Sequence, residues 1–189
     1  MQVMRSGDAF AAFSTPYPLP KPSYPFQMIS TDYFEYAGKW FLIVVDRYSG
    51  WLSIFKAGNN GASDLVIVLK EYFATFGIAE QITSDSGPQY VSNVTKKFLQ
   101  DWDVKHRITS LYFPHANLRA ELGVKSAKRL IRDNIGMNGS LQTDKFLRAL
   151  MLHRNTPDRE TGMSPAKVIF GRAIRNFFPQ LEEERGCIG

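Results

Sequence analysis

Residues 27–57, "QMISTDYFEYAGKWFLIVVDRYSGWLSIFKA", contain three strand-like runs separated by two short turns. The runs cover residues 27–36, 40–46 and 51–57, and they are rich in the β-branched and aromatic residues that favour strands. Connections as short as "AGK" and "YSG" join antiparallel neighbours. This stretch therefore predicts an antiparallel three-stranded meander.

Downstream of the meander, helix-like and strand-like segments alternate. Ser63 is a plausible N-cap, so we predict a helix over residues 64–76 that ends at Gly77. The further segments are a strand (79–84), a helix (92–103), a strand (104–110), a helix that ends at Gly136 and Gly139, and a helix (143–156). Hairpin-joined strands followed by this alternation predict an α/β fold, a mixed sheet with helices on both faces.

Composition limits the class of protein. With 189 residues, 44% of them hydrophobic, the chain has enough material for one core. Its longest apolar runs are too short to cross a bilayer and the amino end has no signal-peptide pattern, so we expect a soluble intracellular protein with no membrane partner. The lone Cys187 and three scattered histidines give neither an internal disulfide nor a zinc-binding spacing. A net charge of +5 favours an anionic partner, with nucleic acid first.

Three acidic residues stand at unusual positions. Asp32 lies inside a strand, where aspartate is disfavoured, Asp85 ends the fourth strand, and Glu121 begins a helix. Each has an ordinary explanation: Asp32 can face solvent, Asp85 can cap the "SGPQ" turn, and Glu121 can complement a helix N-terminus. Alternatively the three converge, and converging carboxylates repel one another unless Mg²⁺ or Mn²⁺ neutralises them.

The helix around Glu121 aligns its cations with its acid. At 100° per residue, Lys125, Lys128 and Arg132 lie within about 40° of Glu121, and Arg129 lies about 80° away. The opposite arc is apolar and can pack on the sheet; it contains Leu122, Val124, Ala127, Leu130 and Ile131. Residues 96–133 hold nine basic and four acidic residues, an excess equal to the net charge of the whole chain. Phosphate attraction is therefore concentrated beside the carboxylates.

The order Asp32, Asp85, Glu121, with thirty-five residues between the last two, resembles the D,D-35-E motif of retroviral and retrotransposon integrases. Four segments in order are similar to the catalytic core of gypsy-type long-terminal-repeat retrotransposon integrases: "STDYFEYAGKWFLIVVDRYSGW", "YFATFGIAEQITSDSGPQY", "YFPHANLRAELGVKSAKRLIRD" and "LHRNTPDRETGMSPAKVIFGR". The resemblance places the core at residues 26–179, between a proline-rich tail or linker (1–25) and a second tail (180–189).

This resemblance implies a ribonuclease H-like fold with a five-stranded mixed sheet flanked by helices. It implies two Mg²⁺ ions, replaceable by Mn²⁺. Asp32 and Asp85 would share one ion, and Asp32 and Glu121 would hold the other. The implied chemistry is processing of the element's DNA ends by water, followed by strand transfer of the freed 3′ hydroxyl into target DNA.

The resemblance also implies DNA contacts and partners. Lys125 and Lys128 match positions that touch DNA near the active site, and Arg129 and Arg132 continue that basic arc. His115 and Asn117, in the loop before the helix, either lie near the substrate or cap the loop. The implied partners are double-stranded DNA and further copies of the chain, as a homodimer or larger oligomer. The implied location is the nucleus, after assembly in cytoplasmic particles.

Two residues depart from the family pattern: Leu118 replaces a glycine, and Ala79 replaces a common proline. The family's zinc-binding and carboxyl-terminal DNA-binding domains have no counterpart in these residues, so we expect an excised core or a domesticated descendant. An isolated core would be limited to the reversal reaction on branched DNA. The alternative is a non-catalytic, integrase-derived module for DNA binding or multimerisation. A nuclease that cuts RNA–DNA hybrids would share the metal site but not the "TGMSPAKVIFGR" segment.

Overall fold

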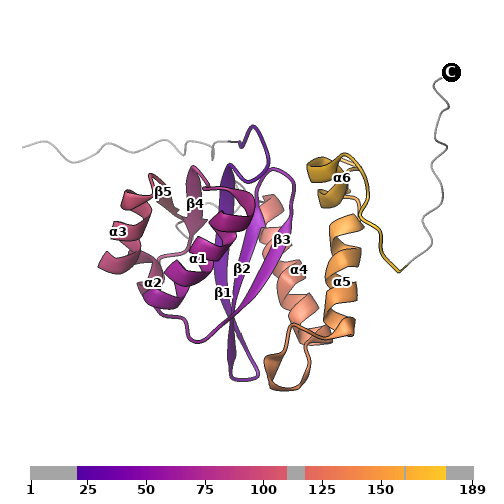
Figure 1. Cartoon of the computed structure of the whole chain (residues 1–189), viewed down its shortest axis with the longest axis horizontal. Coiled ribbons are helices and arrows are strands. Elements are labelled where there is room, and N and C mark those ends of the chain that lie inside the picture. Colours follow the sequence, from indigo (N-terminus) through magenta and orange to yellow (C-terminus); the bar gives the residue numbers. More distant parts are fainter. Residues whose placement is uncertain (1–20, 110–117, 160, 178–189) are drawn as a thin grey trace, which may run out of the picture.

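The computed structural model describes residues 21–109, 118–159 and 161–177. Within them, one five-stranded sheet runs through the middle of the molecule in the order β3-β2-β1-β4-β5 (Figure 1). The strands are β1 (Met28–Tyr36), β2 (Lys39–Asp46), β3 (Leu52–Ala57), β4 (Gln81–Ser84) and β5 (Lys105–Ile108).

The predicted meander is confirmed. β1 pairs with β2, and β2 with β3, both antiparallel, whereas β4 runs parallel to both β1 and β5. The sheet is therefore mixed, as predicted. In the turn between β1 and β2, Ala37 and Gly38 both have positive φ, 50° and 69°, the conformation of the tight turns that match the twist of paired strands.

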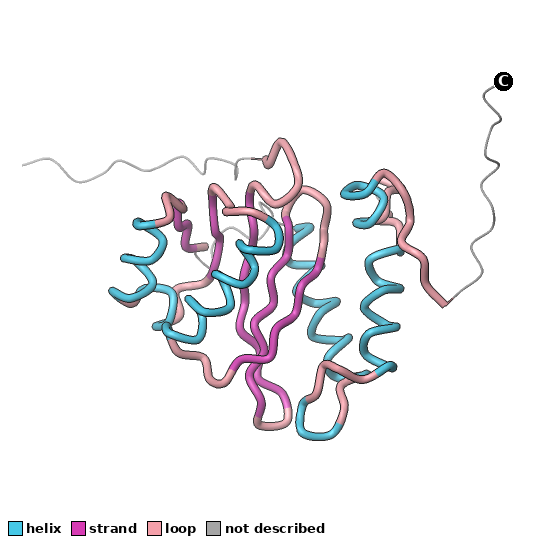
Figure 2. Tube along the Cα trace, in the orientation of Figure 1, coloured by secondary structure: helices cyan, strands magenta, loops and turns pink. Residues whose placement is uncertain are grey.

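Helices cover both faces of the sheet (Figures 1 and 2). One cluster packs the β1, β2 and β4 side chains Ile29, Leu42 and Ile82 against helices α1, α2 and α3. A second cluster packs Phe41 and Ile43 of β2 against α4 and α5. The helices are α1 (Ala62–Phe76), α2 (Pro88–Val91), α3 (Asn93–Asp101), α4 (Leu118–Asn134), α5 (Asp144–Asn155) and α6 (Pro165–Phe170), with a 3-10 turn at Met137–Gly139. No helix in the described ranges is long and apolar enough to cross a membrane.

The start of α1 corrects one prediction. The helix begins at Ala62 after Gly61, whose position provides no side-chain cap, so Ser63 lies inside the helix rather than at its N-cap. The carboxylate of Asp64 instead accepts the backbone N–H of Asn59 at 2.6 Å, which ties the preceding loop to the first turn. The predicted end is confirmed, because Gly77 closes the helix with φ 90°.

The other predicted elements are present but shorter. β4 and β5 have four residues each, α3 begins at Asn93 after the N-cap Ser92, and α5 begins after the N-cap Thr143. Helices α2 and α6 were not predicted. Both are short and begin with a proline in the first turn, where its missing N–H is not needed.

Candidate active site

Asp32 and Asp85 are brought together by the pairing of β1 with β4. The parallel register pairs Ser30 with Thr83, and the same offset carried two residues further sets Asp85 beside Asp32. Asp32 also lies directly opposite Ile43 of β2, so both side chains point to the face that α4 and α5 cover. Asp32 therefore lies in β1, and Asp85 directly follows the neighbouring strand β4.

Tyr90, from the unpredicted helix α2, lies near both carboxylates. Its side chain is fully buried. Burial raises the pKa of the Tyr90 phenol, and the negative charges of Asp32 and Asp85 raise it further. The charges of both aspartates therefore act on the same buried phenol.

Asp85 also has a local structural role. Its Oδ1 accepts the backbone N–H of Gly87 at 2.9 Å, which is the turn-capping role that the sequence left open. The residue is exposed, and this bond orients the carboxylate at the point where the chain leaves β4. Capping the turn and binding a cation are compatible, since a carboxylate has two oxygens and several lone pairs.

Asp32 pairs with a lysine. The Lys128 Nζ lies 2.7 Å from the Asp32 Oδ2, with the two side chains 32% and 26% exposed. The same Nζ lies 5.5 Å from the centre of the Phe34 ring, and the Arg132 guanidinium lies 5.2 Å from it. Partial burial against an aromatic face strengthens such a pair relative to a fully exposed one.

The position of α4 along the sheet decides which of its residues meets Asp32. A Cβ on Gly123 would lie 2.8 Å from the Val45 Cγ1, so the helix touches β2 at this glycine. Val45 pairs with Ser30, two residues before Asp32, and Lys128 is the residue that contacts Asp32. Helix α4 therefore runs alongside β1 in the same direction, with Glu121 on its first turn, before the level of Asp32.

The three predicted carboxylates are not gathered around one point in this structure. Among the described residues, no three His, Cys, Asp or Glu side chains form a group that could hold a metal ion. Asp32 lies in β1 and Asp85 follows the adjacent strand β4, while Glu121 lies half-buried on α4. Their role as a shared set of metal ligands stays a prediction.

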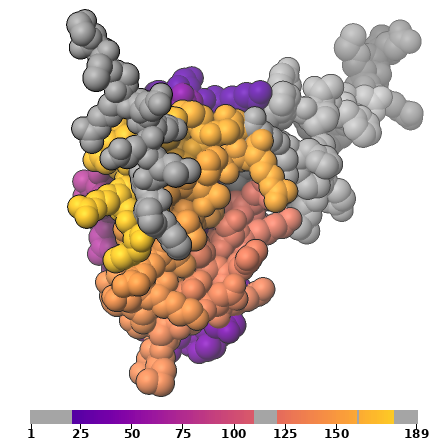
Figure 3. Space-filling view, turned by 90° about the vertical axis from the view of Figure 1, so that its right-hand side faces the viewer, coloured from indigo at the N-terminus to yellow at the C-terminus, as the bar shows by residue number. Residues whose placement is uncertain are grey.

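The basic arc of α4 lies on the outer side of the helix. Lys125, Arg129 and Arg132 are exposed, and Arg129 makes a weak surface pair with Asp133 at 3.7 Å. Figure 3 shows this side of the molecule, with α4 in salmon beside α5 in orange. His115 and Asn117 lie outside the described residues, as does the side chain of Leu118.

The apolar arc of α4 is confirmed with one exception. Ala127 and Ile131 are fully buried, and Val124 and Leu130 pack against the same cluster. Leu122, which the helical wheel also assigned to the packed arc, is 48% exposed. Leu122 lies at the edge of that arc, outside the part of α4 that packs against the sheet.

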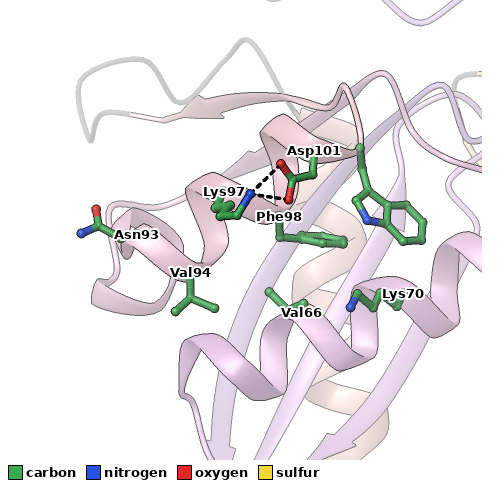
Figure 4. A pocket seen from close by; sticks show the side chains of 8 residues that line it. Val66, Lys70, Asn93, Val94, Lys97, Phe98 and Asp101 are labelled. Atoms are coloured by element: carbon green, nitrogen blue, oxygen red, sulfur yellow. Dashed lines mark hydrogen bonds and ion pairs between the residues drawn. The ribbon is translucent and has the colours of Figure 1, made fainter.

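The opposite face of the sheet carries a separate hollow. A groove of about 480 Å³ between α1 and α3 is lined by side chains that include Val66, Phe98 and Trp102, with an ion pair between Lys97 and Asp101 at its rim (Figure 4). This groove lies on the side of the sheet away from α4, and none of the predicted site residues lines it.

Known proteins share similarity with this chain in both sequence and structure. Residues 22–114 match the family model described as integrase core domain. An uncharacterized protein of Caenorhabditis elegans is 31% identical over 160 residues, 84% of this chain and 12% of that protein. The Gag-Pol polyprotein of avian reticuloendotheliosis virus is 30% identical over 135 residues, 70% of this chain and 12% of the polyprotein. The chain thus spans about an eighth of the length of these relatives.

Solved structures share the fold. A chain of the simian T-cell lymphotropic virus intasome has a TM-score of 0.66 at 18% identity, with 87% of this chain and 61% of that chain covered. The catalytic core domain of BIV integrase has a TM-score of 0.61 at 13% identity, with 76% and 93% covered. The ribonuclease H-like fold is therefore confirmed. Residues 22–114 of this chain are therefore similar to the integrase core domain family.

Proposed function

We propose that this domain is the catalytic core of a gypsy-type long-terminal-repeat retrotransposon integrase, which processes retroelement DNA ends and transfers them into target DNA. The observation that carries the proposal is the parallel register of β1 and β4, which pairs Ser30 with Thr83, two residues before Asp32 and Asp85, on the sheet that α4 covers. The same helix carries Glu121 and the basic arc. Acidic ligands and phosphate-binding cations therefore occupy neighbouring elements.

The donor set suits a hard divalent cation. Asp32, Asp85 and Glu121 would hold Mg²⁺, with Mn²⁺ able to substitute, because carboxylate oxygens are the ligands that these ions prefer. When bound, a pair of such ions activates a water or hydroxyl nucleophile and stabilises the leaving oxygen of a phosphodiester. The ion pair with the Lys128 ammonium shows that the Asp32 carboxylate is accessible to a cation at this face of the sheet.

The chain's own residues would bind and orient DNA. Lys125, Lys128, Arg129 and Arg132 lie on one side of α4 and offer cations to a phosphate backbone beside the carboxylates. The names of similar proteins, a Gag-Pol polyprotein and an intasome, support double-stranded DNA and further integrase copies as partners. A nuclear location belongs to the same proposal.

The test is a reversal assay on branched DNA with Mg²⁺ or Mn²⁺, comparing the parent chain with Glu121→Gln and with Glu71→Gln. Glu71 is an exposed acid of α1 and serves as the matched control. We expect joined product from the parent and from Glu71→Gln, and a loss of at least about a hundredfold in Glu121→Gln, since the neutral amide cannot replace an anionic ligand. Equal product from Glu121→Gln would refute the assignment.

A second function has one observation in its favour. The Lys128 ammonium neutralises the Asp32 carboxylate, and among the described residues no three possible ligands form a metal-binding group. A non-catalytic DNA-binding or multimerisation module would need nothing more. In the same assay, that module would bind the branched DNA with an affinity that divalent ions leave unchanged, and would yield no product with either metal.

A further inference from the structure

A layer of polar side chains lies beneath the two aspartates, on the opposite face of the sheet. His106 of the edge strand β5 pairs with Ile82 of β4, which belongs to the α1–α3 core. Side chains alternate along a strand, so Ser84 shares that face with Ile82, while Asp85 follows directly. Ser84 is 3% exposed.

Hydrogen bonds link His106 to the main chain of Asp85. The Ser84 hydroxyl donates to the Asp85 carbonyl at 2.8 Å, and its oxygen lies 2.8 Å from the His106 Nε2. A serine hydroxyl has only one proton, and here the carbonyl receives it. The Ser84 oxygen therefore accepts a hydrogen bond from the imidazole N–H, which corresponds to the Nε2–H tautomer of His106.

Neighbouring contacts hold this relay in place. The His106 ring lies 6.1 Å from the ring of the buried Tyr90. The Ser84 carbonyl accepts both the backbone N–H and the hydroxyl of Thr109, at 2.8 and 3.0 Å. Burial also lowers the pKa of His106, so the ring is neutral at pH 7 and has one N–H to donate. The relay is thus fixed in direction as well as in position.

We propose that His106 is a positioning residue, which acts through Ser84 to fix the main chain at Asp85 and so aims that carboxylate at a divalent cation. Asp85 is then held on both sides, by this relay at its carbonyl and by the Gly87 N–H at its side chain. The proposal rests on the metal-binding role of Asp85 in the proposed function. Partners that orient a metal ligand change metal affinity by about 10- to 100-fold when they are removed.

The first test measures Mn²⁺ affinity of the full chain without DNA, by electron paramagnetic resonance of free Mn²⁺. We expect His106→Leu to weaken binding by about tenfold or more. His106→Gln should restore most of the affinity, because its side-chain N–H can reach the place of Nε2–H, whereas His106→Asn should not. Thermal unfolding of each variant separates loss of folding from loss of positioning.

The outcomes distinguish this inference from the proposed function. If the parent binds Mn²⁺ and Asp85→Asn abolishes it, but His106→Leu binds as tightly as the parent, the positioning role is refuted and the metal site stands. If the parent and Asp85→Asn do not differ in binding, both proposals fail.

A second measurement needs no metal. Nitrogen NMR of the His106 ring should show the Nε2–H tautomer in the parent, and Ser84→Ala should weaken that preference. A neutral ring protonated on Nδ1 would overturn the relay. Glutamine rescue together with a weaker Nε2–H preference in Ser84→Ala would support it, since neither is expected of a histidine that only fills space.

Discussion

At the scale of single residues, the Lys128–Asp32 pair places an ammonium where a metal ion is proposed to bind. Two cations then compete for one carboxylate, and the phosphates of DNA compete with that carboxylate for Lys128. DNA binding would draw the lysine away and expose Asp32, so the ion pair couples the two events. The pair is 2.7 Å long and only partly exposed, so a competing cation or phosphate has to replace an existing ion pair.

The DNA-binding role of Lys128 can be tested by its salt dependence. We expect Lys128→Gln to weaken binding to duplex DNA and to lower the slope of log affinity against log salt by about one, since one phosphate contact is lost. Lys97→Gln is the control, because this exposed lysine pairs with Asp101 on α3. Fluorescence anisotropy over a salt series measures both. Equal slopes in all three proteins would remove Lys128 from the DNA interface.

Asp46 is a buried structural carboxylate that the sequence did not single out. It is fully buried and accepts the backbone N–H groups of Phe26, Tyr48 and Ser49, as well as the Ser49 hydroxyl. Asp46→Ala would leave these donors unsatisfied, so we expect a loss of roughly 2–4 kcal/mol in the free energy of unfolding. Urea unfolding measures it. A loss below about 0.5 kcal/mol, the range of ordinary surface changes, would show that water satisfies these donors.

At the scale of elements, the close approach of α4 to β2 depends on Gly123. A new Cβ would lie 2.8 Å from the Val45 Cγ1, and Val45 is fully buried and β-branched, so it cannot turn away freely. Overpacking of this kind costs about 1–3 kcal/mol and outweighs the gain of about 1 kcal/mol in helix propensity. We expect Gly123→Ala to destabilise the fold.

A double-mutant cycle tests whether this loss of stability comes from the contact between residue 123 and Val45. Val45→Ala removes the clashing methyl groups, so the two changes together should destabilise the fold by less than the sum of each alone, as measured by denaturant unfolding. Leu122→Ala, at an exposed neighbouring position, is the control and should have little effect. Strict additivity would mean that α4 does not press on Val45.

Helix α5 contributes an acid-sensitive residue. Burial lowers the pKa of His153 below 6.5, and the charge of Arg154 lowers it further. Above pH 6.5 His153 is neutral in both the folded and the unfolded states, so its protonation does not reduce the free energy of unfolding. As the pH falls below 6.5, the unfolded state takes up a proton that the folded state refuses, so stability is lost. His153→Gln should therefore lose less stability than the parent between pH 7.5 and 5.5 in urea titrations. Identical losses would contradict it.

Some elements could be predicted from sequence because their signals are local. The meander follows from residue type and turn length, and Gly77 ends α1 by its own conformation. The N-cap prediction for Ser63 was wrong because the N-cap position depends on how the preceding loop joins the helix. Here the hydrogen bond between Asn59 and Asp64 fixes that junction. Helices as short as α2 give no periodic signal, so Tyr90 could not be placed near the aspartates in advance.

At the scale of the whole molecule, the order of Asp32, Asp85 and Glu121 along the chain predicted a shared site. Whether the three carboxylates meet depends on two features of the fold that the spacing of residues in the sequence does not determine. The first is the register of β1 against β4, which pairs Ser30 with Thr83, two residues before Asp32 and Asp85. The second is the position of α4 along the sheet. A helical wheel gives the direction of a side chain around the axis but not its height, so it could not decide whether Glu121 or Lys128 would meet Asp32.

The most direct test of the central claim is a crystal structure of the chain with Mn²⁺, using anomalous diffraction to locate the ions. We expect anomalous peaks within about 2.0–2.3 Å of carboxylate oxygens of Asp32, Asp85 and Glu121. We also expect that Lys128 has left the Asp32 Oδ2, from which its Nζ now lies 2.7 Å away. Peaks confined to other residues, with the Lys128–Asp32 pair intact at saturating Mn²⁺, would contradict it.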